Sequence, residues 1–146
     1  MCVALHRRSD SLGLARPLVL PRRMSEQSEH LKDRTMTFAV SVLRLIDLLP
    51  RTPGGQVVGR QLAKCSTSVA ANYRAACIAR SKLEFVAKLH IVLEEAEESL
   101  YWLELITRAR LLSSDLLPPM QQEANELRSI FARSFRTARF NLKNRQ

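Results

Sequence analysis

The chain has 146 residues and a formal net charge of +9, from 23 lysines and arginines against 14 aspartates and glutamates. A hydrophobic content of 46% suits one domain with a single core, whereas four glycines and six prolines are too few turn residues for a protein of many short strands. No apolar run approaches the roughly 18 residues of a membrane-spanning helix. The composition therefore favours an all-helical domain, and its positive charge is compatible with a nucleic acid or an acidic protein as partner.

The first 24 residues differ from the rest of the chain. Residues 1–23 contain five arginines and one aspartate. The apolar run at 18–20 is too short for a secretory signal, and the segment resembles an arginine-rich targeting peptide only loosely. We expect residues 1–24 to be a disordered or mis-assigned extension, followed by a folded domain at 25–140 and a basic C-terminal tail at 141–146.

Two amphipathic helices are predicted in the first half of the domain. The first spans about 28–49 and ends at the prolines and glycines of 50–55. The second spans about 56–79, and Thr52 is placed to cap it with Pro53 at the first helical position. The expected core residues are Leu31, Phe38, Val42, Leu45 and Leu49 in the first helix, and Val58, Leu62, Cys65, Val69, Tyr73 and Ala76 in the second.

Two further helices are predicted in the second half. The third spans about 82–112 with Ser81 as its cap, and a helix that continues through Ala79 is the alternative. Pro118 and Pro119 set the start of the fourth helix near 115–119. The expected core residues are Phe85, Leu89, Val92, Leu93, Ala96, Leu100 and Leu103, then Met120, Ala124, Leu127, Phe131, Phe135 and Ala138. Four such helices with short links predict an all-α, antiparallel up-down-up-down four-helix bundle.

The sequence contains no pattern that points to catalysis or to a metal. Cys65 and Cys77 lie about 18 Å apart along one predicted helix, so they cannot form a disulfide there, and a reduced cytoplasmic setting is expected. Di-iron bundles need Glu-x-x-His pairs, but Ala87 occupies the position three residues before His90. The hydroxyls at 66–68 have no histidine placed with them. We expect no enzyme activity, no cofactor, no metal and no small-molecule substrate.

The third helix carries an acidic cluster and a second apolar strip. Glu94 and Glu97 are expected to be solvated. The polar groups expected to pair, within the subunit or across an interface, are Glu95, Glu98, Arg60, Arg74 and Asn72. Because a single bundle buries only one stripe of each helix, a second strip indicates an oligomer surface. That strip consists of Ile91, Trp102 and Leu105.

Basic residues gather on the second and fourth predicted helices. The candidate nucleic-acid-binding residues are Arg60, Lys64, Arg74, Arg128, Arg133, Arg136 and Arg139. No aromatic residue interleaves with them, so one interpretation is a surface that binds phosphates without reading bases. The other interpretation is complementarity to the acidic face of a neighbouring subunit. The sequence does not decide between them.

Three strings of the chain resemble a known family: GRQLAKCSTSVAANYRAA, ARSKLEFVAKL and LEEAEESLYWLEL. They are similar to the small four-helix-bundle proteins encoded in intervening sequences of the bacterial 23S ribosomal RNA gene. The similarity covers about 34–138, and its most specific parts surround Ser68 with Asn72, and Glu95 with Glu98 and Trp102. Members usually have a glutamate after the Asn-Tyr-Arg triplet, where this chain has Ala75.

The resemblance implies an antiparallel bundle that assembles as a ring-like homopentamer. It also implies kinship with the accessory bundle proteins of diversity-generating retroelements, which bind a reverse transcriptase and nucleic acid. The family has no established enzymatic activity. We therefore expect a non-catalytic oligomeric protein that binds nucleic acid or a nucleoprotein through a basic surface, and the alternative is a purely structural scaffold for protein partners.

Overall fold

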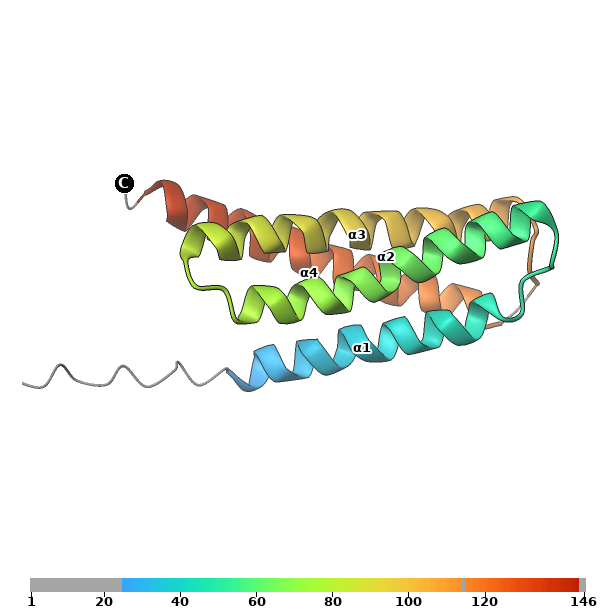
Figure 1. Ribbon diagram of the computed structural model, residues 1–146, viewed down its shortest axis with the longest axis horizontal. Helices are drawn as coiled ribbons and strands as arrows, with labels where there is room; N and C mark the ends of the chain where they lie inside the picture. The colour runs from blue at the N-terminus through green and yellow to red at the C-terminus, as the bar shows by residue number, and fades with distance from the viewer. Residues whose placement is uncertain (1–24, 114, 145–146) are drawn as a thin grey trace, which may run out of the picture.

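The computed structural model describes residues 25–113 and 115–144 and folds them into four α-helices (Figure 1). These are α1 (Glu26–Ile46), α2 (Pro53–Cys77), α3 (Lys82–Arg108) and α4 (Leu117–Lys143), and no described residue lies in a strand. Each helix runs back along the one before it, as the colours of Figure 1 show. The all-α bundle predicted from the sequence is confirmed. The extension at 1–24 lies outside the described residues, and α4 continues into the segment expected to be a tail.

Three of the helices begin at a hydroxyl side chain that caps them. Ser25, Thr52 and Ser81 each accept a hydrogen bond from the backbone N–H three residues further on, which satisfies a group left without a helical partner. The N···O distances are 3.2 Å to Ser28, 3.2 Å to Gly55 and 3.0 Å to Glu84. The predicted caps Thr52 and Ser81 are confirmed, and the break before Ser81 shows that α2 and α3 are separate helices.

The end of α3 differs from the prediction. The helix stops at Arg108 rather than near residue 112, because Arg110 adopts a left-handed conformation with φ of 52°. The Arg110 N–H donates to the Thr107 carbonyl at 3.1 Å and the Leu111 N–H to the Ile106 carbonyl at 3.0 Å, a pattern that terminates helices. Glycine usually occupies this position, and its absence hid the stop.

The order of the helices around the bundle places α3 between α2 and α4. Helix α2 packs extensively along α1 and α3, and α3 packs as extensively along α4. Contacts between α1 and α4 are few, and the backbones of the described helices do not come close across the diagonals, where core side chains such as Tyr73 of α2 and Phe131 of α4 meet instead. The bundle therefore has one loosely packed side, between its first and last helices.

The core lies along the inner faces of all four helices. Leu45, Leu62, Leu103 and Phe131 are among the largest side chains that are fully buried. Most of the predicted core residues are buried, while Leu31, Leu93, Leu100, Phe135 and Ala138 are partly buried and pack against the core. Phe85 was expected in the core, and that prediction is wrong. It lies in the first turn of α3, where it is 36% exposed and lines a hollow at the end of the bundle.

Three polar side chains are fully buried in the core, and each is satisfied by its own helix. The hydroxyls of Thr35, Ser66 and Ser99 donate to the backbone carbonyls of Lys32, Ala63 and Glu95 at 2.9, 3.2 and 2.8 Å. No buried side-chain nitrogen or oxygen of the described residues lacks a hydrogen-bond partner. Burying these hydroxyls therefore leaves no unpaired polar atom.

The turn between α1 and α2 brings two backbone segments into close contact at Gly55. A Cβ atom at this position would lie 2.0 Å from the carbonyl oxygen of Pro50, which no side chain tolerates without movement of the turn. The adjacent Gly54 has open space, with nothing within 4 Å of the same atom. The two glycines therefore form a natural pair for a test.

Replacing Gly55 with alanine is expected to lower the free energy of unfolding by about 1–3 kcal/mol, because the turn must shift to relieve the overlap. Gly54→Ala is the matched control, and it is expected to raise that free energy by up to about 1 kcal/mol through helix propensity. Urea denaturation followed by circular dichroism measures both. Equal stabilities of the two variants would contradict the close approach at Gly55.

Candidate nucleic-acid interface

The outer face of α2 carries the first set of predicted phosphate-binding cations. Arg60, Lys64 and Arg74 are all exposed, and none has a hydrogen-bond or ion-pair partner among the described residues. They span about 21 Å of helix from first to last. Helix α2 contains no acidic residue, and the exposed Thr67 and Ala71 between the cations are small. A chain of phosphates can therefore approach this face closely.

The second set of cations lies on the C-terminal half of α4. Arg128 is engaged, because its guanidinium lies 3.3 Å from the carboxylate of Glu97 on α3 and also donates to Asn125. Arg133, Arg136 and Arg139 are exposed and have no such partner within the described part of the chain. Three of the four predicted arginines are thus available to an external anion.

The structure does not bring the two sets together. Helices α2 and α4 occupy diagonally opposite corners of the bundle, with α1 and α3 between them. The outer face of α3 carries the glutamates Glu94, Glu97 and Glu98, so on that side acid separates the two basic surfaces. The sequence shows the cations on both helices, but their arrangement around the bundle makes them two separate surfaces.

The acidic cluster of α3 is partly used within the subunit. Glu94 lies 3.8 Å from His90 one turn away, and Glu97 reaches Arg128. Glu95 is half-buried and Glu98 is exposed, and neither has a hydrogen-bond or ion-pair partner in the described ranges. Burial raises the pKa of the Cys65 thiol on α2, the hydroxyl of Ser99 lowers it, and the charges of Glu95 and Glu98 raise it, so both carboxylates act on the neighbouring helix α2.

The predicted partners of these carboxylates do not reach them within one subunit. The amide of Asn72 donates to the carbonyl and the hydroxyl of Ser68, both at 3.0 Å. Arg60 and Arg74 point into solvent from the outer face of α2. Pairing across a subunit interface therefore remains the prediction for Glu95 and Glu98.

The apolar strip on the back of α3 is half-buried. Ile91, Trp102 and Leu105 all have intermediate exposure, and Trp102 and Leu105 pack against the core of their own subunit. Tyr101, which is 55% exposed, stands edge-on to the Trp102 ring at 4.9 Å between ring centres. One side of the strip thus packs against the core, and a smaller part of it remains accessible to solvent.

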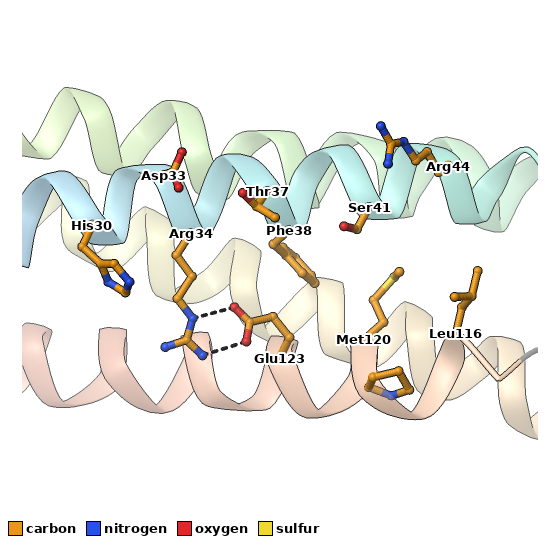
Figure 2. Close-up of a pocket in the computed structure, with 11 residues that line it drawn as sticks. His30, Asp33, Arg34, Thr37, Phe38, Ser41, Arg44, Leu116, Met120 and Glu123 are labelled. Atoms are coloured by element: carbon orange, nitrogen blue, oxygen red, sulfur yellow. Dashed lines mark hydrogen bonds and ion pairs between the residues drawn. The ribbon is translucent and has the colours of Figure 1, made fainter.

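A groove between α1 and α4, with a volume of about 690 Å³, was not predicted from the sequence (Figure 2). Phe38, Leu116 and Met120 give it an apolar lining. Arg34 of α1 crosses it to α4, where its Nε and Nη2 lie 2.6 and 2.7 Å from the two carboxylate oxygens of Glu123.

Glu126, one turn further along α4, completes this cluster at 2.5 Å from the same guanidinium. The hydrogen bonds raise the pKa of Arg34 and lower the pKa of Glu126, so these two groups are held in their charged forms near neutral pH. Two carboxylates three residues apart on one helix are the only sequence signal of this cluster. The arginine that they bind lies 89 residues away from Glu123, beyond the reach of local patterns.

The described residues offer no constellation for catalysis. Burial raises the pKa of the thiols of Cys65 and Cys77, which leaves little reactive thiolate, and raises the pKa of Tyr73 to about 12. No group of three or more histidine, cysteine, aspartate or glutamate side chains in the described ranges is arranged to hold a metal ion. None of the four helices contains a segment long and apolar enough to cross a bilayer.

The fold defines the class of protein as an all-α four-helix bundle. Its distinguishing features are the charged outer faces of its helices. The chain belongs to the 23S rRNA-intervening sequence protein family, which matches residues 29–133. This match confirms the resemblance carried by the three sequence strings and reaches all four helices.

Among solved structures, the chain is similar to a protein of unknown function from the S23 ribosomal protein family of Bacteroides thetaiotaomicron VPI-5482. The two are 29% identical with a TM-score of 0.68, and the match covers 75% of this chain and 98% of that chain. Curated protein sequences give no significant match.

Replacing Arg34 with methionine is expected to lower the free energy of unfolding by about 1 kcal/mol at pH 7, because it removes a partly exposed ion-pair cluster while keeping an unbranched apolar stem. Arg133→Met, at an exposed arginine with no partner among the described residues, is the matched control and is expected to change the free energy by less than about 0.5 kcal/mol.

The stability difference between wild type and Arg34→Met is expected to depend on pH in a defined direction. The pKa of Glu126 is lower in the folded protein, so its contribution is present above the unfolded value and disappears as the pH falls through the folded value. The difference between wild type and Arg34→Met in urea denaturation is therefore expected to shrink below about pH 4. A difference that stays constant into acid would show that the cluster contributes nothing through charge.

Proposed function

We propose that the protein is a cytoplasmic, non-catalytic bundle that assembles with copies of itself and binds nucleic acid, or a nucleoprotein, by contacts to phosphates. The observation that carries the proposal is the outer face of α2. Its three exposed cations have no acidic partner among the described residues, and the helix that bears them contains no acid. Cations that serve only solubility are usually interspersed with acidic residues on the same surface.

The residues around the cations favour phosphate contact over base recognition. The one aromatic side chain of α2, Tyr73, is 8% exposed and packs at a tilt against Phe131 of α4, with ring centres 5.3 Å apart. It is not available to stack on a base. Binding that depends on phosphates alone releases counterions and therefore weakens steeply as salt rises.

The cations of α4 supply a second and separate contact. Because α2 and α4 lie at opposite corners, a single strand lying flat on α2 does not touch Arg133, Arg136 or Arg139 of the same subunit. In an assembly, these arginines are available to a second segment of nucleic acid or to an acidic surface of a protein partner. A nucleoprotein offers both kinds of ligand at once.

Replacing Arg60, Lys64 and Arg74 together with alanine is expected to weaken binding of a short RNA by about tenfold or more at low salt, and to flatten the salt dependence. The matched variant replaces Arg133, Arg136 and Arg139. Fluorescence anisotropy across a salt series measures both. Loss of binding only in the α4 variant would transfer the site to α4, and absence of wild-type binding at low salt would refute nucleic-acid binding.

Self-assembly is proposed to use the edge of α3 nearest α2, as a ring of identical subunits. Glu95 and Glu98 have carboxylates without partners on this edge, and Trp102 and Leu105 retain an accessible rim. A ring interface is heterologous, so the edge of one subunit meets a different surface of the next. On such a surface, the two positive charges of Arg60 and Arg74 match the two negative charges of Glu95 and Glu98 of the neighbouring subunit.

This arrangement also supports the second candidate function, a structural scaffold whose charges serve only contacts between subunits. The unpaired carboxylates of α3 and the unpaired guanidiniums of α2 are the observation that favours it. In this case the cations of α2 are covered in the assembly and do not bind phosphate. The two functions therefore differ in what the same arginines contact.

Reversing the charges of α2 with Arg60→Glu and Arg74→Glu separates the two functions. Loss of RNA binding with unchanged mass by light scattering is expected if the arginines contact phosphate. A fall in mass is expected if they pair with the acids of a neighbour, and adding Glu95→Arg and Glu98→Arg is then expected to restore the assembly. A wild-type protein that is monomeric at all concentrations would refute the proposed ring.

A further inference from the structure

Helix α1 has an exposed face that neither the core nor the α3 edge uses. Met36, Val40 and Leu43 follow one another at helical spacing and are 41%, 38% and 42% exposed. Three large apolar side chains on successive turns form a continuous patch, and such a patch on a helix is typical of a contact surface. Wheel geometry places this face roughly opposite the core stripe of α1.

The charges at the two ends of this patch are opposite. Asp33 lies one turn before the patch and Arg44 lies at its far end, and both are exposed without a hydrogen-bond or ion-pair partner among the described residues. Asp33 and Arg44 also line the groove between α1 and α4, but in Figure 2 only Arg34 reaches across it to α4, whereas Asp33 and Arg44 point away from that helix. These two charges are therefore free to meet an external group.

The positions of these residues are symmetric about one point of the helix. Asp33 and Arg44 lie equally far from the midpoint between Thr37 and Val40, and so do His30 and Asp47. Two copies of α1 packed antiparallel about that midpoint place each Asp33 opposite the Arg44 of the other copy. Thr37 and Val40 then form the centre, and Met36 and Leu43 of both copies lie on either side of it.

The spacing of the series places these residues on one side of α1. The exposed residues 30, 33, 37, 40, 44 and 47 follow one another at steps of three and four, but five of the six are polar or charged, so charge and not an apolar coiled-coil seam selects the pairing. A parallel pairing would set Asp33 against Asp33 and Arg44 against Arg44, so the charges select the antiparallel one. A contact between two identical faces requires this self-complementarity, because each pair of contacting residues occurs twice, once on either side of the two-fold axis.

We propose that this face of α1 binds the α1 face of a second copy of the chain in an antiparallel, two-fold symmetric contact. Nucleic acid fits the face poorly, since Asp33 and Asp47 would oppose phosphates. The contact goes beyond the proposed ring, because it uses α1 instead of the α3 edge and joins subunits two at a time. One helix pair buries less surface than the roughly 1,200–2,000 Å² of a stable interface, so the association is expected to be weak and to depend on concentration.

The test is a charge swap measured by sedimentation velocity on the full chain without nucleic acid, across a wide range of concentration. Asp33→Arg and Arg44→Asp are each expected to weaken the concentration-dependent association by about tenfold or more, because both symmetry-related pairs become repulsive. The double variant Asp33→Arg/Arg44→Asp restores opposite charges and is expected to return the association to near the wild-type level.

The control variant Glu104→Arg makes the same charge change at an exposed residue of α3, whose glutamate has no partner among the described residues, and is expected to leave the association unchanged. Circular dichroism checks that each variant is folded. The proposal is overturned if wild type shows no concentration-dependent association, if the single variants associate as wild type does, or if the double variant fails to recover. The test also works if the proposed ring does not form, because the α1 contact would then join two monomers into a dimer, which sedimentation velocity detects.

Discussion

The order of the helices around the bundle is the constraint on which the other features depend. Helix α3 is held on both sides, by α2 and by α4, through the most extensive packing in the molecule. Its acidic face therefore lies between the two basic helices, and the outer faces of α2 and α4 stay apart. This order turns a chain with a large positive charge into one with separate basic surfaces, and it leaves the side between α1 and α4 to a single charged cluster.

The first and last helices are consequently joined in a different way from the others. Elsewhere apolar side chains interdigitate, whereas the α1–α4 side is bridged by Arg34 and two carboxylates above a groove. Such a cluster fixes the relative position of two helices without filling the space between them. Helix α1 keeps its outer face uncovered, and that face carries apolar residues and opposite charges. The surfaces proposed for self-association are thus those that the internal packing leaves free.

Features determined by neighbours along the chain could be predicted from the sequence, and features determined by distant contacts could not. The caps at Thr52 and Ser81 were predicted because a hydroxyl and an N–H three residues apart are sufficient to form them. The end of α3 was missed because Arg110 takes a left-handed conformation that glycine usually marks. Phe85 was misplaced because helical periodicity does not show where the neighbouring helices end. Arg34 and Glu123 could not be paired without knowing which helices are adjacent.

The three buried hydroxyls have a consequence for how this fold can change. The hydroxyls of Thr35, Ser66 and Ser99 donate to carbonyls of their own helices, and only Ser99 also contacts another helix, at the thiol of Cys65 on α2. Polar groups that bond between elements fix a single alignment, and groups that bond within an element do not. Inside the core, the alignment of these helices is therefore set mainly by the shapes of side chains, whereas polar bonds between helices lie nearer the surface, at Arg34 with Glu123 and at Arg128 with Glu97. A core substitution that changes side-chain volume acts on this alignment, and a helix that shifts carries its surface charges with it.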